Sequence, residues 1–282
     1  LMGSWRFAAF ALLSPIMAIF NLIQGRRSGA ADYKRKLAAY ESTLVKVRER
    51  AAEALARERT ERRAALPDPA QVLLQAVGPG ARLWERRRTD PDYLVLRVGT
   101  ATRASQVRVE DPNVDRNAED VAPATVADVP VPVALRDFGV LGVTGAADQV
   151  DATARWLIGQ AAVLHSPRDL RLVVLTDQRG EDRLGWVRWL PHTRTDDETL
   201  PAFVGNEQQS IGARVGELTR LVTDRVAAAE EGFGAGAKEM TGPDYLVVLD
   251  GARLLRALPG VVTILRQGPA VGVRVICLDP DR

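Results

Sequence analysis

The chain has 282 residues, of which 46% are hydrophobic and 26% are charged, as in ordinary globular proteins. Its net charge of only +2 argues against a basic field over the whole protein that would bind nucleic acid. The single cysteine, Cys277, excludes an internal disulfide, so we predict a reducing environment and a small core residue in an apolar strand.

The first 25 residues predict a transmembrane helix. Residues 5–23 carry one charge, Arg6, and about 20 apolar residues are enough to span a lipid bilayer. The alternative is an amphipathic helix buried in a soluble domain. Because the chain opens on Leu1 so close to this span, we expect it to be a fragment of a longer protein.

Basic residues follow the span directly and predict its orientation. By the positive-inside rule, they place the C-terminal bulk of the chain on the cytoplasmic side of the inner (plasma) membrane. The cluster consists of Arg26, Arg27, Lys34, Arg35 and Lys36.

Residues 26–66 predict a basic stalk helix. Residues 26–65 hold 12 Lys or Arg against 6 Asp or Glu, and no Gly or Pro occurs from Asp32 to Leu66. A helix of about 34 residues is roughly 50 Å long and projects from any small core. Apolar residues recur at the spacing of a heptad stripe, and we predict that this stripe contacts another chain. Its candidate contact residues are Tyr33, Leu37, Tyr40, Leu44 and Val47.

Residues 67–129 predict a small α+β region ahead of the main domain, which we call the preface. We expect a short helix over 71–76, a strand over 93–98, a polar connector over 110–128 and an extended edge segment over 129–133. The adjacent residues Arg86, Arg87 and Arg88 indicate intramolecular ion pairs or a solvated turn rather than a nucleic-acid patch, because aromatic residues do not alternate with them.

From residue 130 to residue 282 strands alternate with helices, which predicts a doubly wound α/β domain. Apolar runs such as 172–175 and 245–249 are typical of parallel strands buried on both faces. The predicted strands are 171–176, 244–250 and 272–278, and the predicted helices are 148–164 and 208–230.

Residues 138–147 predict a buried strand that runs into a glycine turn at 142–145 and then into a helix, which is the arrangement of a P-loop. There a Lys and a Ser or Thr would follow the last Gly and bind phosphate and metal. Here Ala146 and Ala147 stand at those two positions. Downstream, Asp250 ends an apolar strand as a Walker B Asp does, but Gly251 follows it instead of a Glu.

We therefore predict a degenerate P-loop-NTPase-like domain, in which no residue is catalytic. The alternatives are weak nucleotide binding through backbone groups and a turn that only packs. The remnant of the nucleotide pocket consists of Gly142, Thr144, Gly145 and Asp250.

The remaining polar candidates predict no metal site and no triad. His165 and His192 have no Cys or Glu partner at metal-ligand spacing, and Ser166 has no base beside it. His165 ends a predicted helix and is interpreted as a structural cap. Trp186 and Trp189, in a predicted loop, either cover the edge of the core or contact a partner.

Several motifs together resemble one known family. LWERR with DPDYLVLRVG occurs at 83–99, GVLGVTG at 139–145, LHSPRDLRLVVL at 164–175, GWVRWLPH at 185–192 and YLVVLDG at 245–251. With the apolar span and the charged stalk, this order resembles the membrane-proximal part of the EccC family, the FtsK/SpoIIIE-type motor ATPases of actinobacterial type VII secretion systems.

The resemblance implies that the degenerate domain is of the RecA/FtsK type. It also implies a truncated chain whose better-equipped motor domains, with ATP and Mg²⁺, lie outside it. It also implies an oligomeric assembly in an inner-membrane complex with subunits of the EccB, EccD and EccE type, and substrates of the WXG class. No cofactor is expected in this segment itself.

The leading hypothesis is a membrane-anchored segment that couples cytosolic ATPase domains to the export channel. One alternative is a functional FtsK-like ATPase or DNA translocase. Another is a soluble scaffold domain.

Overall fold

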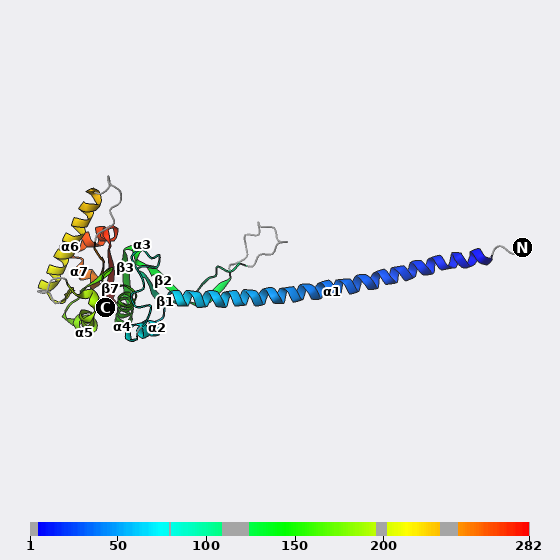
Figure 1. The fold of residues 1–282 in the computed structure, drawn as a ribbon, viewed down its shortest axis with the longest axis horizontal. Coiled ribbons are helices and arrows are strands. Elements are labelled where there is room, and N and C mark those ends of the chain that lie inside the picture. The colour runs from blue at the N-terminus through cyan, green and yellow to red at the C-terminus, as the bar shows by residue number, and fades with distance from the viewer. Residues whose placement is uncertain (1–4, 79, 109–123, 196–201, 232–241, 282) are drawn as a thin grey trace. The chain divides into compact units, whose positions relative to one another are not determined.

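The computed structural model describes most of the chain in two units (Figure 1). One unit comprises residues 1–60 and 103–126, and the other comprises residues 61–102 and 127–282. Side chains are described from residue 31 onward, except those of residues 178 and 179. The described residues are 5–78, 80–108, 124–195, 202–231 and 242–281.

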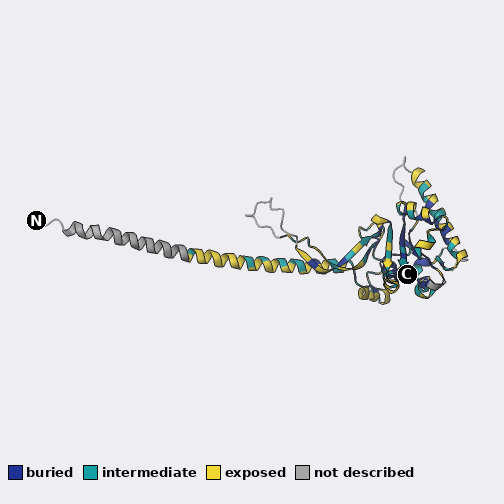
Figure 2. Cartoon of the chain, turned by 180° about the vertical axis from the view of Figure 1, so that it is seen from behind, coloured by how far each residue is buried: buried dark blue, intermediate teal, exposed yellow. Residues whose placement is uncertain are grey.

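The first unit consists mainly of helix α1 (Trp5–Ala65), which continues into the second unit with its last turn. The run without Gly or Pro after Asp32 explains why the second half of this helix is uninterrupted. Its described side chains are mostly exposed (Figure 2). Near its end, Glu58 is buried because its carboxylate accepts hydrogen bonds from the Ser105 hydroxyl and from the backbone N–H of Gln106.

The predicted membrane span lies in the part of α1 whose side chains are not described. Elsewhere in the described chain, the helices are too short or too polar to cross a bilayer.

Helix α2 (Pro69–Val77) opens the preface of the second unit. It begins two residues before the predicted start at residue 71, because Asp68 accepts a hydrogen bond from the N–H of Gln71 and forms a capping box, with Pro69 in the first turn. Strands β1 (Val95–Ala104) and β2 (Thr125–Ala134) form a two-stranded sheet. β2 therefore occupies the end of the predicted connector over 110–128, of which residues 109–123 lie outside the described residues.

A five-stranded sheet, entirely parallel, forms the centre of the second unit. Its strand order, β3-β7-β6-β4-β5, confirms the predicted parallel α/β fold. The two-residue strand β5 was not predicted, because a pair of residues carries no periodic signal. The strands are β3 (Val140–Gly145), β4 (Leu170–Leu175), β5 (Val204–Gly205), β6 (Asp244–Asp250) and β7 (Val273–Pro280).

Alternate residues of the central strands pack on opposite faces of the sheet. Leu246 and Val248 belong to a core that includes α4 (Ala147–Leu164), whereas Val247 and Leu249 face a second core. The second core contains residues of α6 (Gln208–Glu231) and α8 (Val261–Gln267). Figure 2 shows buried residues in the strands, as expected for a sheet covered on both faces. Half-buried Cys277 packs against the second core.

Short helical elements connect the strands. They are α3 (Leu135–Phe138), α5 (Gln178–Leu184), η1 (Gly185–Trp189), η2 (Pro191–Thr193), α7 (Ala252–Leu255) and η4 (Gly268–Val271). The segment predicted as a loop around Trp186 and Trp189 is thus 3-10 helical. Because all five strands are parallel, the residues after β4 and β6, which are neighbours, meet at the same edge of the sheet.

Candidate functional site

Asp250, at the carboxyl end of β6, is engaged by two donors. Its side chain is only 5% exposed. The Oδ2 atom accepts a hydrogen bond from the Thr176 hydroxyl at 2.6 Å and forms an ion pair with Arg183 Nη2 at 2.8 Å. A Walker B carboxylate holds Mg²⁺. Here both donors compete with any cation for that oxygen.

Arg183 connects two acidic residues at this edge of the sheet. It lies in α5 and pairs with Asp151 of α4 as well as with Asp250. The guanidinium therefore offsets the charge of a carboxylate from the helix that follows β3 and of one at the end of β6. Sequence reasoning missed Arg183, Thr176 and Asp151, because none of them belongs to a recognisable spacing.

Helix α5 reaches Asp250 because residue 180 is a glycine. A Cβ atom at Gly180 would overlap the Thr176 hydroxyl and Asp250 Oδ2. Asp177 begins the helix by accepting a hydrogen bond from the Gly180 N–H at 2.8 Å. Close packing at Gly180 thus places Arg183 one turn further along, beside the carboxylate.

The predicted glycine turn over 142–145 is wrong in its extent. Gly142 and Thr144 lie inside strand β3, opposite Cys277 and Asp279 of β7. Gly145, with φ 137°, ends the strand, and Ala146 alone separates it from α4. A phosphate-binding loop surrounds phosphate with several successive N–H groups, and a single-residue connection is too short to do so.

Gly251, the residue after Asp250, has a backbone conformation that favours glycine over other residues. Gly251 has φ 78°, in the left-handed region, where it caps α7, and its N–H donates to Leu278 O at 3.0 Å. A Glu at this position would be strained, because residues with a Cβ rarely adopt that conformation.

The motifs that carry the family resemblance meet at His165. The ring accepts a hydrogen bond at Nε2 from the Leu94 N–H at 3.0 Å, and Tyr93 packs edge-on against it. The His165 carbonyl accepts from His192 Nε2 at 2.7 Å, and Trp84 Nε1 donates to Ala162 O at 3.1 Å. The WERR, DPDYL, LHSP and WLPH segments therefore form one buried joint.

His165 is neutral in this joint. Its Nδ1 lies 2.9 Å from Ala161 O and donates to it, which leaves Nε2 as the acceptor for Leu94. Burial, with smaller contributions from the nearby Arg86 and His192, lowers the pKa of His165 to about 3. The predicted structural role of His165 is confirmed, although it acts through its buried ring rather than as a charged cap.

Three arginines hold the C-terminal end of α1. Arg82 donates to Ala64 O at 2.9 Å, Arg86 to Ala65 O at 3.0 Å and Arg97 to Leu66 O at 3.0 Å. The last carbonyls of a helix lack intrahelical partners, and positive charge there is favoured by the helix dipole. We call Arg82, Arg86 and Arg97 the arginine clamp.

Arg86 is the most buried member of the arginine clamp, with 1% exposure. It also donates to Val95 O at 2.7 Å and pairs with Asp92. The neighbouring Arg87 and Arg88 pair with Asp169 and Asp244. The intramolecular ion pairs predicted for these three adjacent arginines are therefore confirmed.

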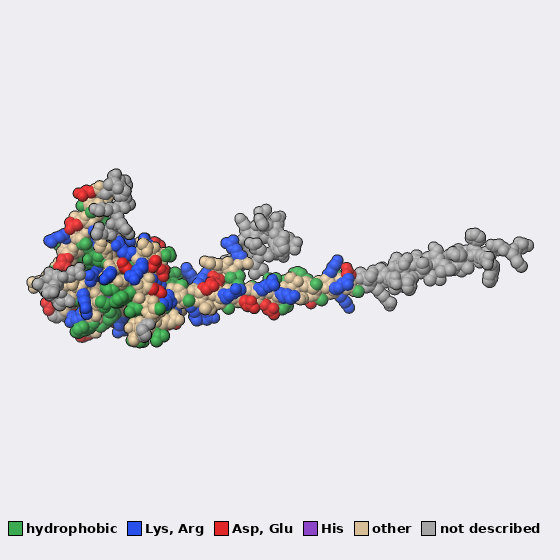
Figure 3. Space-filling model, in the orientation of Figure 1, with side chains coloured by type: hydrophobic (Ala, Val, Ile, Leu, Met, Phe, Trp, Pro, Cys, Tyr) green, Lys and Arg blue, Asp and Glu red, His purple; other side chains and the backbone are tan. Residues whose placement is uncertain are grey.

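The predicted contact residues differ in exposure. Trp186 is half-buried against the core, whereas Trp189 is 82% exposed. On α1, Tyr33, Leu37 and Tyr40 are exposed, and Leu44 and Val47 are half-buried. Figure 3 shows basic and acidic side chains interspersed with hydrophobic ones along this part of the helix.

The curated proteins that this chain resembles in sequence include several EccC proteins of ESX secretion systems. The chain is 26% identical over 255 residues to the ESX secretion system protein EccC of Thermomonospora curvata, which covers 84% of this chain. It is 28% identical over 92% of its length to EccC4 of the ESX-4 system of Mycobacterium tuberculosis, and 33% identical over 66% to EccC3 of the ESX-3 system of the same species. No protein-family model matches.

The chain spans between 15% and 22% of the length of these relatives. The solved cytoplasmic domain of the T. curvata type VII secretion ATPase EccC aligns with a TM-score of 0.47 at 19% identity, over 74% of this chain and 23% of that one. This likeness is too weak to add to the topology described above. By its sequence, the chain is a homologue of the EccC proteins of ESX secretion systems.

Proposed function

We propose that the chain is a membrane-anchored, stalk-containing segment of a type VII secretion motor ATPase. It couples cytosolic ATPase domains to the protein-export channel of the inner membrane, with its C-terminal bulk in the cytoplasm. The proposal extends to the whole protein the role named for its relatives, which are several times longer. Subunits of the EccB, EccD and EccE type and substrates of the WXG class belong to the same proposal.

The observation that carries the coupling role is the arginine clamp. A stalk transmits force or position only if its end is fixed to the domain that moves. In the second unit, Arg82, Arg86 and Arg97 bind three successive carbonyls at the end of α1. Arg86 is buried, its Nη1 and Nη2 donate to Val95 O and Ala65 O, and its charge is paired with Asp92, so the last turn of α1 cannot separate from the preface without leaving part of that buried charge without a partner.

The domain acts as a docking and coupling part, and its nucleotide site is degenerate. The residues do not fit a magnesium nucleotide: Ala146 and Ala147 offer neither charge nor hydroxyl, and Arg183 and Thr176 engage Asp250. The remnant formed by Gly142, Thr144, Gly145 and Asp250 therefore supports the fold and not hydrolysis.

Membrane anchoring rests on the sequence of residues 5–23 and on the basic residues that follow them. The exposed part of the heptad stripe on α1 gives the stalk a surface for a second chain, because Tyr33 and Tyr40 are 68% and 61% exposed.

The test is a pull-down of the tagged protein from detergent-solubilised membranes of its own host. Replacing Leu37 and Leu44 by Asp places two charges in the stripe, and recovery of the other membrane components should fall by about tenfold. Ala39→Asp with Ser42→Asp adds the same charge outside the stripe and should leave recovery unchanged. Equal recovery with both double variants would contradict the proposed stalk contact.

A further inference from the structure

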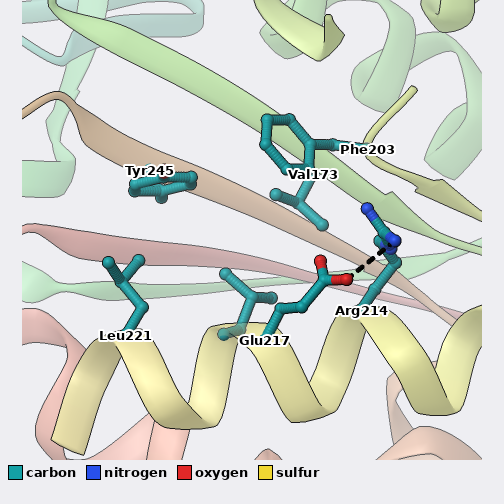
Figure 4. Close-up of a pocket in the computed structure, with 7 residues that line it drawn as sticks. Val173, Phe203, Arg214, Glu217, Leu221 and Tyr245 are labelled. Carbon is teal, nitrogen blue, oxygen red and sulfur yellow. Dashed lines mark ion pairs between the residues drawn. The ribbon is translucent and has the colours of Figure 1, made fainter. Parts of the chain in front are cut away.

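A pocket of about 150 Å³ lies between helix α6 and one face of the five-stranded sheet (Figure 4). Its walls are apolar and aromatic, and Phe203 and Tyr245 meet edge to face at 6.2 Å. Cavities of this size and lining take up a single benzene-sized group. The lining residues are Val173, Phe203, Arg214, Glu217, Leu218, Leu221 and Tyr245.

Arg214 brings an unsatisfied donor to this pocket. Its side chain is 5% exposed, and Nη2 pairs with Glu217 Oε1 at 2.8 Å. The guanidinium also lies 5.9 Å from the centre of the Phe203 ring (Figure 4). Nη1, however, is buried and has no hydrogen-bond partner among the described residues. A buried donor without an acceptor is costly, so Nη1 favours a ligand that supplies an oxygen.

The Arg214–Glu217 ion pair determines whether the oxygen of the ligand should be charged or neutral. Glu217 already balances the charge of Arg214, so an anionic ligand gains little attraction and meets the Glu217 carboxylate. A neutral carbonyl satisfies Nη1 without that repulsion. Glu217 is 44% exposed, and its carboxylate can accept an N–H from the same ligand. A donor and an acceptor side by side match a secondary amide.

We propose that this pocket binds a peptide segment through one apolar side chain and its adjacent backbone amide. The side chain enters between Phe203, Tyr245 and the leucines of α6. The peptide carbonyl accepts a hydrogen bond from Arg214 Nη1, and the peptide N–H donates to Glu217. This binding is independent of the coupling role proposed above.

The test uses the full chain in detergent, with isotope-labelled Leu and Val methyl groups observed by NMR. N-acetyl-phenylalanine amide is the probe, and it should shift the methyl signals of Val173, Leu218 and Leu221. N-acetyl-glycine amide lacks the apolar group, and toluene lacks the amide. Both should bind about tenfold more weakly or not at all.

Arg214→Met separates binding from folding, because it removes the unpartnered donor and keeps the length of the side chain. The variant should have an unchanged or higher melting temperature, and it should bind the probe about tenfold more weakly than the wild type does. Arg220→Met makes the same substitution at an exposed position of α6 and should bind as the wild type does.

Leu221→Phe fills the pocket and should abolish binding, which keeps the proposal testable should Arg214→Met not fold. Absence of shifts in the wild type, or wild-type affinity in the filled variant or in a folded Arg214→Met protein, would overturn the proposal.

Discussion

Among single residues, Asp250 has the largest chemical consequence, because its buried carboxylate is held by Thr176 and Arg183. A carboxylate in this setting depends on its partners, since an unpaired buried charge is strongly unfavourable. The same contacts that stabilise the edge of the sheet make Asp250 a poor ligand for a metal ion.

Arg183→Met should therefore destabilise the second unit by about 3 kcal/mol, because it leaves both Asp250 and Asp151 without their cation. Urea unfolding followed by circular dichroism measures the change. Arg188→Met is the matched control: Arg188 pairs with Glu181 but is 42% exposed, so its loss should cost less than about 1 kcal/mol. Equal midpoints for Arg183→Met and wild type would contradict this assignment.

His165 predicts a pH dependence of stability. Burial holds the pKa of His165 in the folded chain at about 3, below the unfolded value of about 6.5. Between these two pH values the unfolded chain binds a proton at His165 and the folded chain does not. Its contribution is complete above pH 6.5 and is lost as the pH falls towards 3. Each pH unit by which the pH falls in that window lowers the free energy of unfolding by about 1.4 kcal/mol.

His165→Gln keeps a donor and an acceptor but cannot titrate. The wild type should be more stable than this variant at pH 7, and the difference should shrink between pH 6.5 and pH 4 in urea unfolding. A difference independent of pH would show that His165 does not titrate as proposed.

At the scale of elements, the end of α1 depends on side chains from the preface. Arg86 binds Ala65 O and Val95 O and pairs with Asp92, whereas Arg87, the next residue, is 58% exposed beside Asp169. Two adjacent arginines thus differ sharply in burial.

Arg86→Met should lower the free energy of unfolding by about 3–5 kcal/mol, because two carbonyls and one carboxylate lose their buried partner. Arg87→Met should cost less than about 1 kcal/mol. Urea unfolding compares the two variants directly, and hydrogen exchange of the last turn of α1 should accelerate only in Arg86→Met. Similar losses for the two variants would mean that the clamp does not fix the helix end.

At the scale of the whole molecule, the parallel α/β topology does not by itself imply that the chain binds a nucleotide. A ligand present at 100 times its dissociation constant stabilises a protein by about 2.7 kcal/mol. We expect millimolar Mg-ATP to leave the melting temperature of this chain unchanged, because Ala146 and Ala147 supply no charge for phosphate and Asp250 is already paired.

The control is Asp250→Ala, which should give the same flat titration at its own melting temperature. A shift in the wild type that disappears in Asp250→Ala would contradict the degenerate site and favour a functional ATPase.

The sequence predicted the parallel sheet, helices α4 and α6 and the helix over 26–66. Each of these depends on local hydrophobic periodicity or on a continuous apolar run, which is visible within a short window. It failed at β5, at the 3-10 turns around Trp186 and Trp189, and at Gly142 and Thr144. In those places, pairing with neighbouring strands or packing on the core decided the backbone.

By itself, the sequence determined the fold class, the lack of a charge or hydroxyl at Ala146 and Ala147, and the heptad spacing of apolar residues over 33–47, because these follow from residue type and spacing. Only the tertiary structure decided that Arg183 pairs with Asp250, that the arginine clamp holds the end of α1, and that Arg214 Nη1 has no partner within the described part of the chain. The Arg183 contact joins residues 67 positions apart and the Arg86 contact residues 21 apart, and both depend on how strands and loops come together. No local pattern encodes those distances.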